Sequence, residues 1–154
     1  MNNEKVKSTS DRDSAEVLQA VYKCGKMGSD SAISLLKYAK TNEMKTDMTS
    51  ILDGYQKMSS SSSEKLMKMG ITPEETDVFA KMGSKIGMTV NTMIDSSNSH
   101  LAEMVIQGAN MGITDIQSCV NKHKNTSCDK EVIRDAEQGI AFNQQVIEDM
   151  KKYL

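Results

Sequence analysis

The most compact pair of residues in this sequence that could do chemistry is His100 and Glu103. Residues three apart share one face of a helix, so the carboxylate could orient the imidazole for acid–base catalysis or join it as a metal ligand. The structural alternative is that His100 stands near a helix start and Glu103 is its surface or capping partner.

A polar layer at the centre of a helical bundle would give this pair a role. The candidate neighbours lie on three other expected helices, and they are Ser62, Asn143 and either Asp30 or Ser31. Buried polar groups without partners cost about 1–3 kcal/mol each, so such a layer would need internal hydrogen bonds, water or an ion. A metal or small-ligand site at the bundle centre is therefore one hypothesis.

The motif of helical di-metal enzymes is missing. These bundles take Glu-x-x-His from each of two helices, but the residues three before His100 and His123 are Ser97 and Val120. The absence argues against a di-iron oxidase or a ferritin. We therefore expect no catalytic residues, no metal and no other cofactor, with a reduced metal site as the alternative.

Three cysteines, Cys24, Cys119 and Cys128, form no CxxC motif. An odd count without metal-like spacing fits a reducing compartment, which predicts a cytoplasmic protein. Cys24 and Cys119 fall at apolar helix positions and are expected to be buried. Cys128 lies in a polar stretch and is expected to be exposed, with the nearby His123 only an incidental neighbour in sequence.

Methionine dominates the apolar residues, with 13 Met against two Phe and no Trp. Thioethers bind Cu(I), and Met67-x-Met69 and the pair Met104 and Met111 could be read as such ligands. Their helical spacing favours core filling instead. The flexible side chains also predict a Met-rich face through which the protein forms a homo-oligomer or binds a protein partner.

Charge and hydropathy exclude two classes of partner. The formal net charge is −2 and the charges are mixed along the chain, so there is no basic field for nucleic acid or an anionic membrane. No apolar run approaches the roughly 20 residues of a membrane span, and the N-terminus has no apolar signal-peptide core. Residues 1–13 are polar and are expected to form a disordered tail.

Apolar residues at helical spacing predict the helices of a single domain over 14–154. The first helix is expected over 14–40, capped by Asp13 or Ser14, and the second runs from Met44 to Met69 through a five-serine run. A capping box at Thr72-Pro73-Glu74-Glu75 opens one bent helix or two consecutive helices over 73–122, with a break near 96–99. Asp129 caps the last helix.

Two glycines on the apolar face of 99–119, Gly108 and Gly112, each cost roughly 1 kcal/mol relative to alanine in a helix. Close packing of another backbone would offset that cost. We therefore expect both glycines to lie against the helix over 14–40.

The segment SHLAEMVIQGANMGITDI, residues 99–116, resembles an uncharacterised bacterial branch of the ferritin-like four-helix proteins. The resemblance extends over about 14–154 and includes 81–83, 91–95 and 147–154. It implies an all-α, antiparallel four-helix bundle of two hairpins joined by a longer helical crossover. Serines in the second helix and Asn143, Gln144 and Gln145 in the last replace the metal ligands of the wider group. We therefore expect a non-catalytic binding or self-association module.

Overall fold

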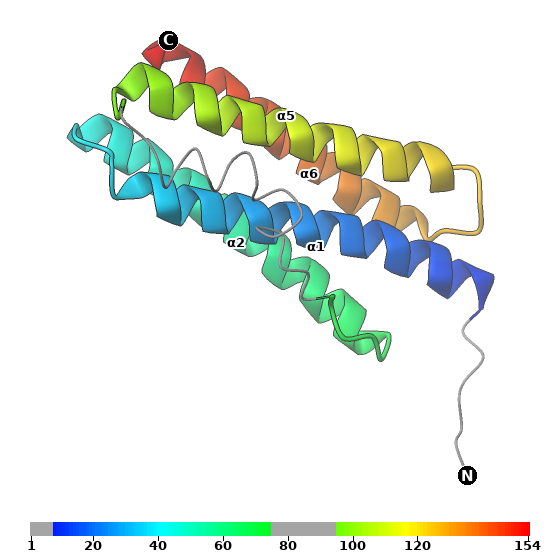
Figure 1. Ribbon diagram of the computed structural model, residues 1–154. Coiled ribbons are helices and arrows are strands. Elements are labelled where there is room, and N and C mark those ends of the chain that lie inside the picture. Colours follow the sequence, from blue (N-terminus) through cyan, green and yellow to red (C-terminus); the bar gives the residue numbers. More distant parts are fainter. Residues whose placement is uncertain (1–7, 75–94) are drawn as a thin grey trace.

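The computed structural model describes residues 8–74 and 95–154, and this part of the chain is helical, with four long helices and no strand (Figure 1). The elements are α1 (Thr9–Leu36), α2 (Asn42–Lys68), α5 (Asn98–His123), α6 (Lys130–Met150) and a short 3-10 helix, η1 (Lys151–Tyr153). The predicted all-helical fold with four long helices is confirmed. None of the described helices is long and apolar enough to cross a membrane.

The helices pack in the two pairs expected from the sequence. α1 packs along α2 and α5 packs along α6, while α1 also contacts both α5 and α6. The ends of the pairs meet as well: Asn98 Nδ2 donates to Thr41 Oγ1 at 3.2 Å, and Ser10 Oγ donates to the carbonyl of Ser127 at 2.6 Å. This packing is compatible with a four-helix bundle.

Side-chain caps set the starts of all four long helices. The hydroxyl or carboxylate oxygens of Ser8, Thr41, Ser97 and Asp129 accept backbone N–H groups of the first turns. The cap at Ser97 separates α5 from the preceding segment, so a single bent helix through 95–97 is excluded. The predicted cap at Asp129 is confirmed.

The predicted start of the first helix at Asp13 or Ser14 is wrong, because α1 begins at Thr9. Residues 9–13, expected in a disordered tail, are helical, and residues 1–7 lie outside the described residues. Contacts between distant parts of the chain favour the longer helix: besides the Ser10 bond, the backbone N–H of Asp129 donates to Ser14 Oγ at 3.0 Å.

The predicted helix start at Pro73 is also wrong, since residues 71–74 are not helical. The remainder of that expected helix, through residue 94, lies outside the described residues. The five-serine run is helical as predicted, and the hydroxyl of Ser62 donates a hydrogen bond to the carbonyl of Met58, four residues earlier in α2.

Methionines fill much of the core between these helices. Met44, Met48, Met104 and Met150 are buried among aliphatic side chains, as the spacing predicted. Met67 and Met111 are exposed, so Met111 does not continue the apolar face of α5. The fully buried aliphatic side chains of the described residues include Val17, Leu18, Leu35, Leu66, Leu101, Ile116 and Val146.

The two glycines of α5 have different surroundings. A Cβ on Gly112 would lie 2.7 Å from Cys24 Sγ of α1, which confirms the predicted close approach. A Cβ on Gly108 would meet nothing within 4 Å, so the same prediction is wrong there. α1 instead makes its tightest glycine contacts with α2, where a Cβ on Gly28 would lie 2.4 Å from the ring of Tyr55.

Candidate functional site

The pair predicted from sequence lies at the start of α5 rather than at mid-bundle. His100 Nδ1 and Glu103 Oε2 are 3.4 Å apart, and the Glu103 side chain is 56% exposed. The backbone N–H of His100 donates to the capping hydroxyl of Ser97, which places the histidine in the first turn. These contacts match the structural alternative, in which His100 stands near a helix start and Glu103 is its surface partner.

The other candidate residues do not gather around that pair. Ser62 bonds within its own helix, and Asp30 lies 3.9 Å from Lys26, one turn earlier in α1. Asn143 is fully buried, but its hydrogen-bond partners come from outside the predicted set. Ser31 lines a crevice between α1 and α5.

Asn143 organises a small polar network inside the bundle. Its Oδ1 accepts the Tyr55 hydroxyl at 2.7 Å, and its Nδ2 donates to the carbonyl of Gly139 at 2.8 Å and to Cys24 Sγ at 3.5 Å. Burial raises the pKa of the Cys24 thiol to about 11 and also raises the pKa of Tyr55. Both groups are neutral and bonded, so the network joins α1, α2 and α6 and leaves no free ligand.

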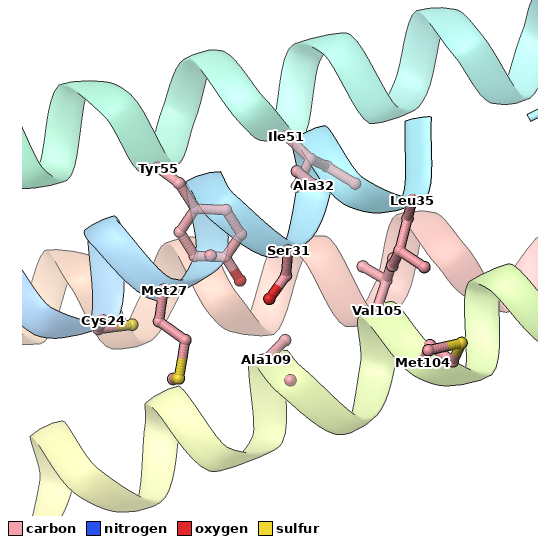
Figure 2. A pocket seen from close by; sticks show the side chains of 12 residues that line it. Cys24, Met27, Ser31, Ala32, Leu35, Ile51, Tyr55, Met104, Val105 and Ala109 are labelled. Atoms are coloured by element: carbon pink, nitrogen blue, oxygen red, sulfur yellow. The ribbon is translucent and has the colours of Figure 1, made fainter. Parts of the chain in front are cut away.

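An apolar crevice runs between α1 and α5. Figure 2 shows Met27 and Ser31 pointing from α1 toward α5, and Tyr55 reaching toward the crevice from α2, above them in this view. Met104 and Gly108 line its α5 side. Its cavity of about 30 Å³ has room for about two water molecules at most, far less than the roughly 300–1,000 Å³ of small-molecule sites.

A second polar cluster joins the start of α1 to the end of α5. One ligand-type atom from each of Glu16, Cys119 and His123 lies within 4.8 Å of the other two. His123 is buried in the last turn of α5, Cys119 is half-buried one turn earlier, and Glu16 reaches them from α1 with a side chain 48% exposed. Carboxylate, thiolate and imidazole groups are the usual protein ligands of zinc.

The two carboxylate oxygens of Glu16 contact different partners, and these contacts determine the electrostatics of the cluster. Oε1 accepts the Lys122 ammonium at 2.6 Å, whereas Oε2 lies 2.9 Å from His123 Nε2. The hydrogen bond from Lys122 is the largest cause of a lowered Glu16 pKa, although burial opposes it. Burial raises the pKa of the Cys119 thiol. Glu16 is therefore an anionic group held beside a thiol whose ionisation is disfavoured by burial.

The other nitrogen of His123 faces a second carboxylate. Nδ1 is buried and makes no hydrogen bond, but it lies 3.4 Å from Asp13 Oδ1. Ser127 Oγ donates to the other oxygen of Asp13 at 3.5 Å. An orphaned buried nitrogen is rare in folded proteins and calls for a specific explanation.

This cluster was not predicted from the sequence, although its spacing was visible there. Cys119 and His123 are four residues apart, a spacing that places both side chains on one face of a helix. Asp13 and Glu16 are three residues apart and likewise share one face of α1. Two predictions hid the pattern, because the expected helix ended at residue 122, just before His123, and Asp13 was assigned to a helix cap. Cys128 is buried rather than exposed, since it packs beside Ser14 of α1, whose hydroxyl is 3.7 Å from Cys128 Sγ.

Comparison with protein-family profiles, curated proteins and solved structures finds no significant match to this chain.

Proposed function

We propose that this protein is a non-catalytic helical bundle that binds one divalent transition-metal ion through Glu16, Cys119 and His123. The observation that carries the proposal is the convergence of these three ligand types within 4.8 Å around a buried imidazole. The sequence predicted a non-catalytic binding or self-association module without a metal, with a reduced metal or small-ligand site at the bundle centre as the alternative. The proposal keeps that alternative but moves the site to the end of the bundle.

The ligand chemistry favours an ion of the zinc class. A thiolate selects borderline or soft cations over Mg²⁺ and Ca²⁺, which take oxygen ligands, and zinc accepts all three ligand types in tetrahedral sites. Three protein ligands leave a fourth position for water or another donor. Glu16 can serve the ion with Oε2 while Oε1 keeps its bond to Lys122, so binding need not break that ion pair.

The test is a titration of the full chain, stripped of metal by a chelator, with Zn²⁺ and with Co²⁺ as a spectroscopic probe. We expect one ion per chain, a thiolate-to-cobalt charge-transfer band, and protection of Cys119 from alkylation by Zn²⁺. Cys119→Ser should abolish the band. Cys128→Ser, which changes the buried cysteine at the same end of the bundle, is the matched control and should retain it.

An ordinary ion-pair cluster would give different results. Glu16, Lys122 and His123 would then join α1 to α5 without an ion, Co²⁺ would produce no charge-transfer band, and Zn²⁺ would leave the alkylation of Cys119 unchanged. Either equal binding by Cys119→Ser or the absence of stoichiometric binding in the wild-type chain would overturn the proposal.

For the fold, we propose the finer arrangement implied by the resemblance, an antiparallel ferritin-like bundle of two hairpins. Two contacts support it: the start of α5 lies beside the α1–α2 connection through Asn98 and Thr41, and the start of α1 lies beside the α5–α6 connection through Ser10 and Ser127. A crystal structure with α1 and α5 running in the same direction would refute this arrangement. The bacterial origin and the cytoplasmic location stay predictions, as does the absence of nucleic-acid partners.

A second candidate function is self-association through the crevice between α1 and α5. The open space at Gly108 and the thioethers of Met27 and Met104 suit an apolar side chain from a second copy, and the net charge of −2 gives little repulsion between copies. Gly108→Leu should fill the crevice and shift the mass measured by light scattering to that of a monomer. Asn110→Leu, at an exposed position of α5, is the control. A wild-type chain that is monomeric at high concentration would exclude this function.

A further inference from the structure

We infer that Asp13 is the positioning residue of the metal site, holding His123 in the tautomer that presents Nε2 to the ion; this rests on the proposed function. The structure places a carboxylate on each side of the imidazole. Asp13 Oδ1 lies 3.4 Å from Nδ1, and Glu16 Oε2 lies 2.9 Å from Nε2. Asp13 and Glu16 occupy one face of α1, three residues apart, so a single helix supplies both groups.

Without an ion, the imidazole of His123 makes a hydrogen bond to Glu16 but none to Asp13. A carboxylate can only accept, so the close contact with Glu16 requires a proton on Nε2. In a neutral imidazole, Nδ1 then carries a lone pair that faces the carboxylate of Asp13. The absence of a hydrogen bond at the buried Nδ1 is compatible with this tautomer. The ring is therefore incompletely satisfied while it bonds Glu16.

An ion at Nε2 resolves the conflict. The metal takes the lone pair of Nε2, so the proton of the neutral ring must be on Nδ1, where Asp13 is its acceptor. The imidazole has the same net charge in both states, because the proton lost from Nε2 to solvent is matched by one gained at Nδ1. Shortening the present 3.4 Å separation by about 0.5 Å would give an ordinary hydrogen bond.

Among the acidic residues at the start of α1, Asp13 is the one that faces Nδ1 of His123. Asp13 is partly buried and its Oδ2 accepts the hydroxyl of Ser127, which orients the carboxylate toward the ring. Asp11 lies in the same first turns but is exposed. Carboxylates behind a metal-bound histidine raise its basicity and fix its orientation, and their loss typically lowers metal affinity 10- to 100-fold.

The experiment compares Zn²⁺ affinity, measured by competition with a chromophoric chelator, in the full-length wild type, Asp13→Ala and Asp11→Ala. We expect roughly a 10- to 100-fold loss for Asp13→Ala and no change for Asp11→Ala, which removes the same charge from the same end of α1. Asp13→Asn keeps an acceptor oxygen and should recover part of the affinity. Circular dichroism verifies that each variant is folded.

A second measurement on the wild-type chain does not depend on any variant. Nitrogen NMR of the Zn²⁺-loaded protein should show a proton on Nδ1 of His123 and metal coordination at Nε2. Coordination at Nδ1, or equal affinity in the Asp13→Ala and Asp11→Ala chains, would overturn the role of Asp13 while the metal site remained. A wild-type chain that binds no Zn²⁺ would instead overturn the proposed function itself.

Discussion

Replacing each glycine of α5 by alanine separates helix propensity from tertiary packing on one helix. Gly108 and Gly112 are one turn apart and have the same intrinsic cost. A Cβ on Gly108 would meet nothing within 4 Å, whereas one on Gly112 would lie 2.7 Å from Cys24 Sγ and 3.0 Å from Asn143 Oδ1. We expect Gly108→Ala to stabilise the protein and Gly112→Ala to be clearly less stable than Gly108→Ala.

The magnitude follows from two terms. Each substitution gains about 0.5–1 kcal/mol because alanine loses less backbone entropy in a helix. Only Gly112→Ala adds overpacking, which costs about 1–3 kcal/mol in well-packed interiors. Its new methyl group cannot be absorbed cheaply, because Cys24 and Asn143 are themselves buried and bonded to each other. The propensity gain cancels in the comparison, so the two variants should differ by the overpacking term alone.

Urea denaturation of the wild type and both variants at one temperature measures this difference. For a domain of this size, it corresponds to a gap of roughly 2–12 °C in melting temperature. Unchanged slopes of the unfolding free energy against urea would indicate that the variants differ in stability rather than in the denatured state. Variants within about 0.5 kcal/mol of each other would refute the packing argument for Gly112.

Three further predictions concern buried and paired groups. Burial alone would raise the Asp47 pKa, but hydrogen bonds from Lys152 and Tyr153 outweigh burial and lower it. Because Asp47→Asn removes the charge that these bonds stabilise, it should reduce the melting temperature by about 2–4 °C. Because the folded pKa is lowered, that difference should be constant above about pH 5 and shrink as the pH falls below about 4; a gap that widens in acid would contradict it. Asn143→Leu should lower the free energy of unfolding in urea by about 1–3 kcal/mol, because it leaves the Tyr55 hydroxyl without its partner. Tyr55→Phe in the same chain should recover part of that loss. Fully additive effects of the two substitutions would argue against the hydrogen bond. Burial raises the Cys24 pKa to about 11, so peptide mass spectrometry at pH 8 should find Cys24 alkylated far more slowly than Cys119 in the metal-free protein, and equal rates would contradict the buried placement.

The sequence predicted the helices well where local chemistry and apolar spacing agree. Asp129 was predicted as a cap and a break was predicted near 96–99, and the serine run stayed helical because the apolar positions kept their phase across it. The start of α1 could not be predicted in the same way. Ser8 competes with Asp13 and Ser14 as a cap, and long-range bonds such as that of Ser10 to Ser127 favour the longer helix.

The candidate site shows the opposite balance. The pair His100 and Glu103 was found by spacing and lies together, but at an exposed helix start. The pattern Cys119-x-x-x-His123 was equally visible in the sequence. It indicates a site only together with Glu16, which lies 103 residues before Cys119 in the chain. Spacing along one helix reports which residues share a face, but it carries no information on which other helix that face meets.

The sequence by itself therefore determined the helical class, the cap of α6, the break before α5 and the methionine core, because each depends on residues within a few turns of one another. Only the tertiary structure decided the different packing of Gly108 and Gly112 and the meeting of Glu16 with Cys119 and His123. These depend on how far one helix slides and rotates against another, which is set by the packing of the whole interior rather than by any local pattern.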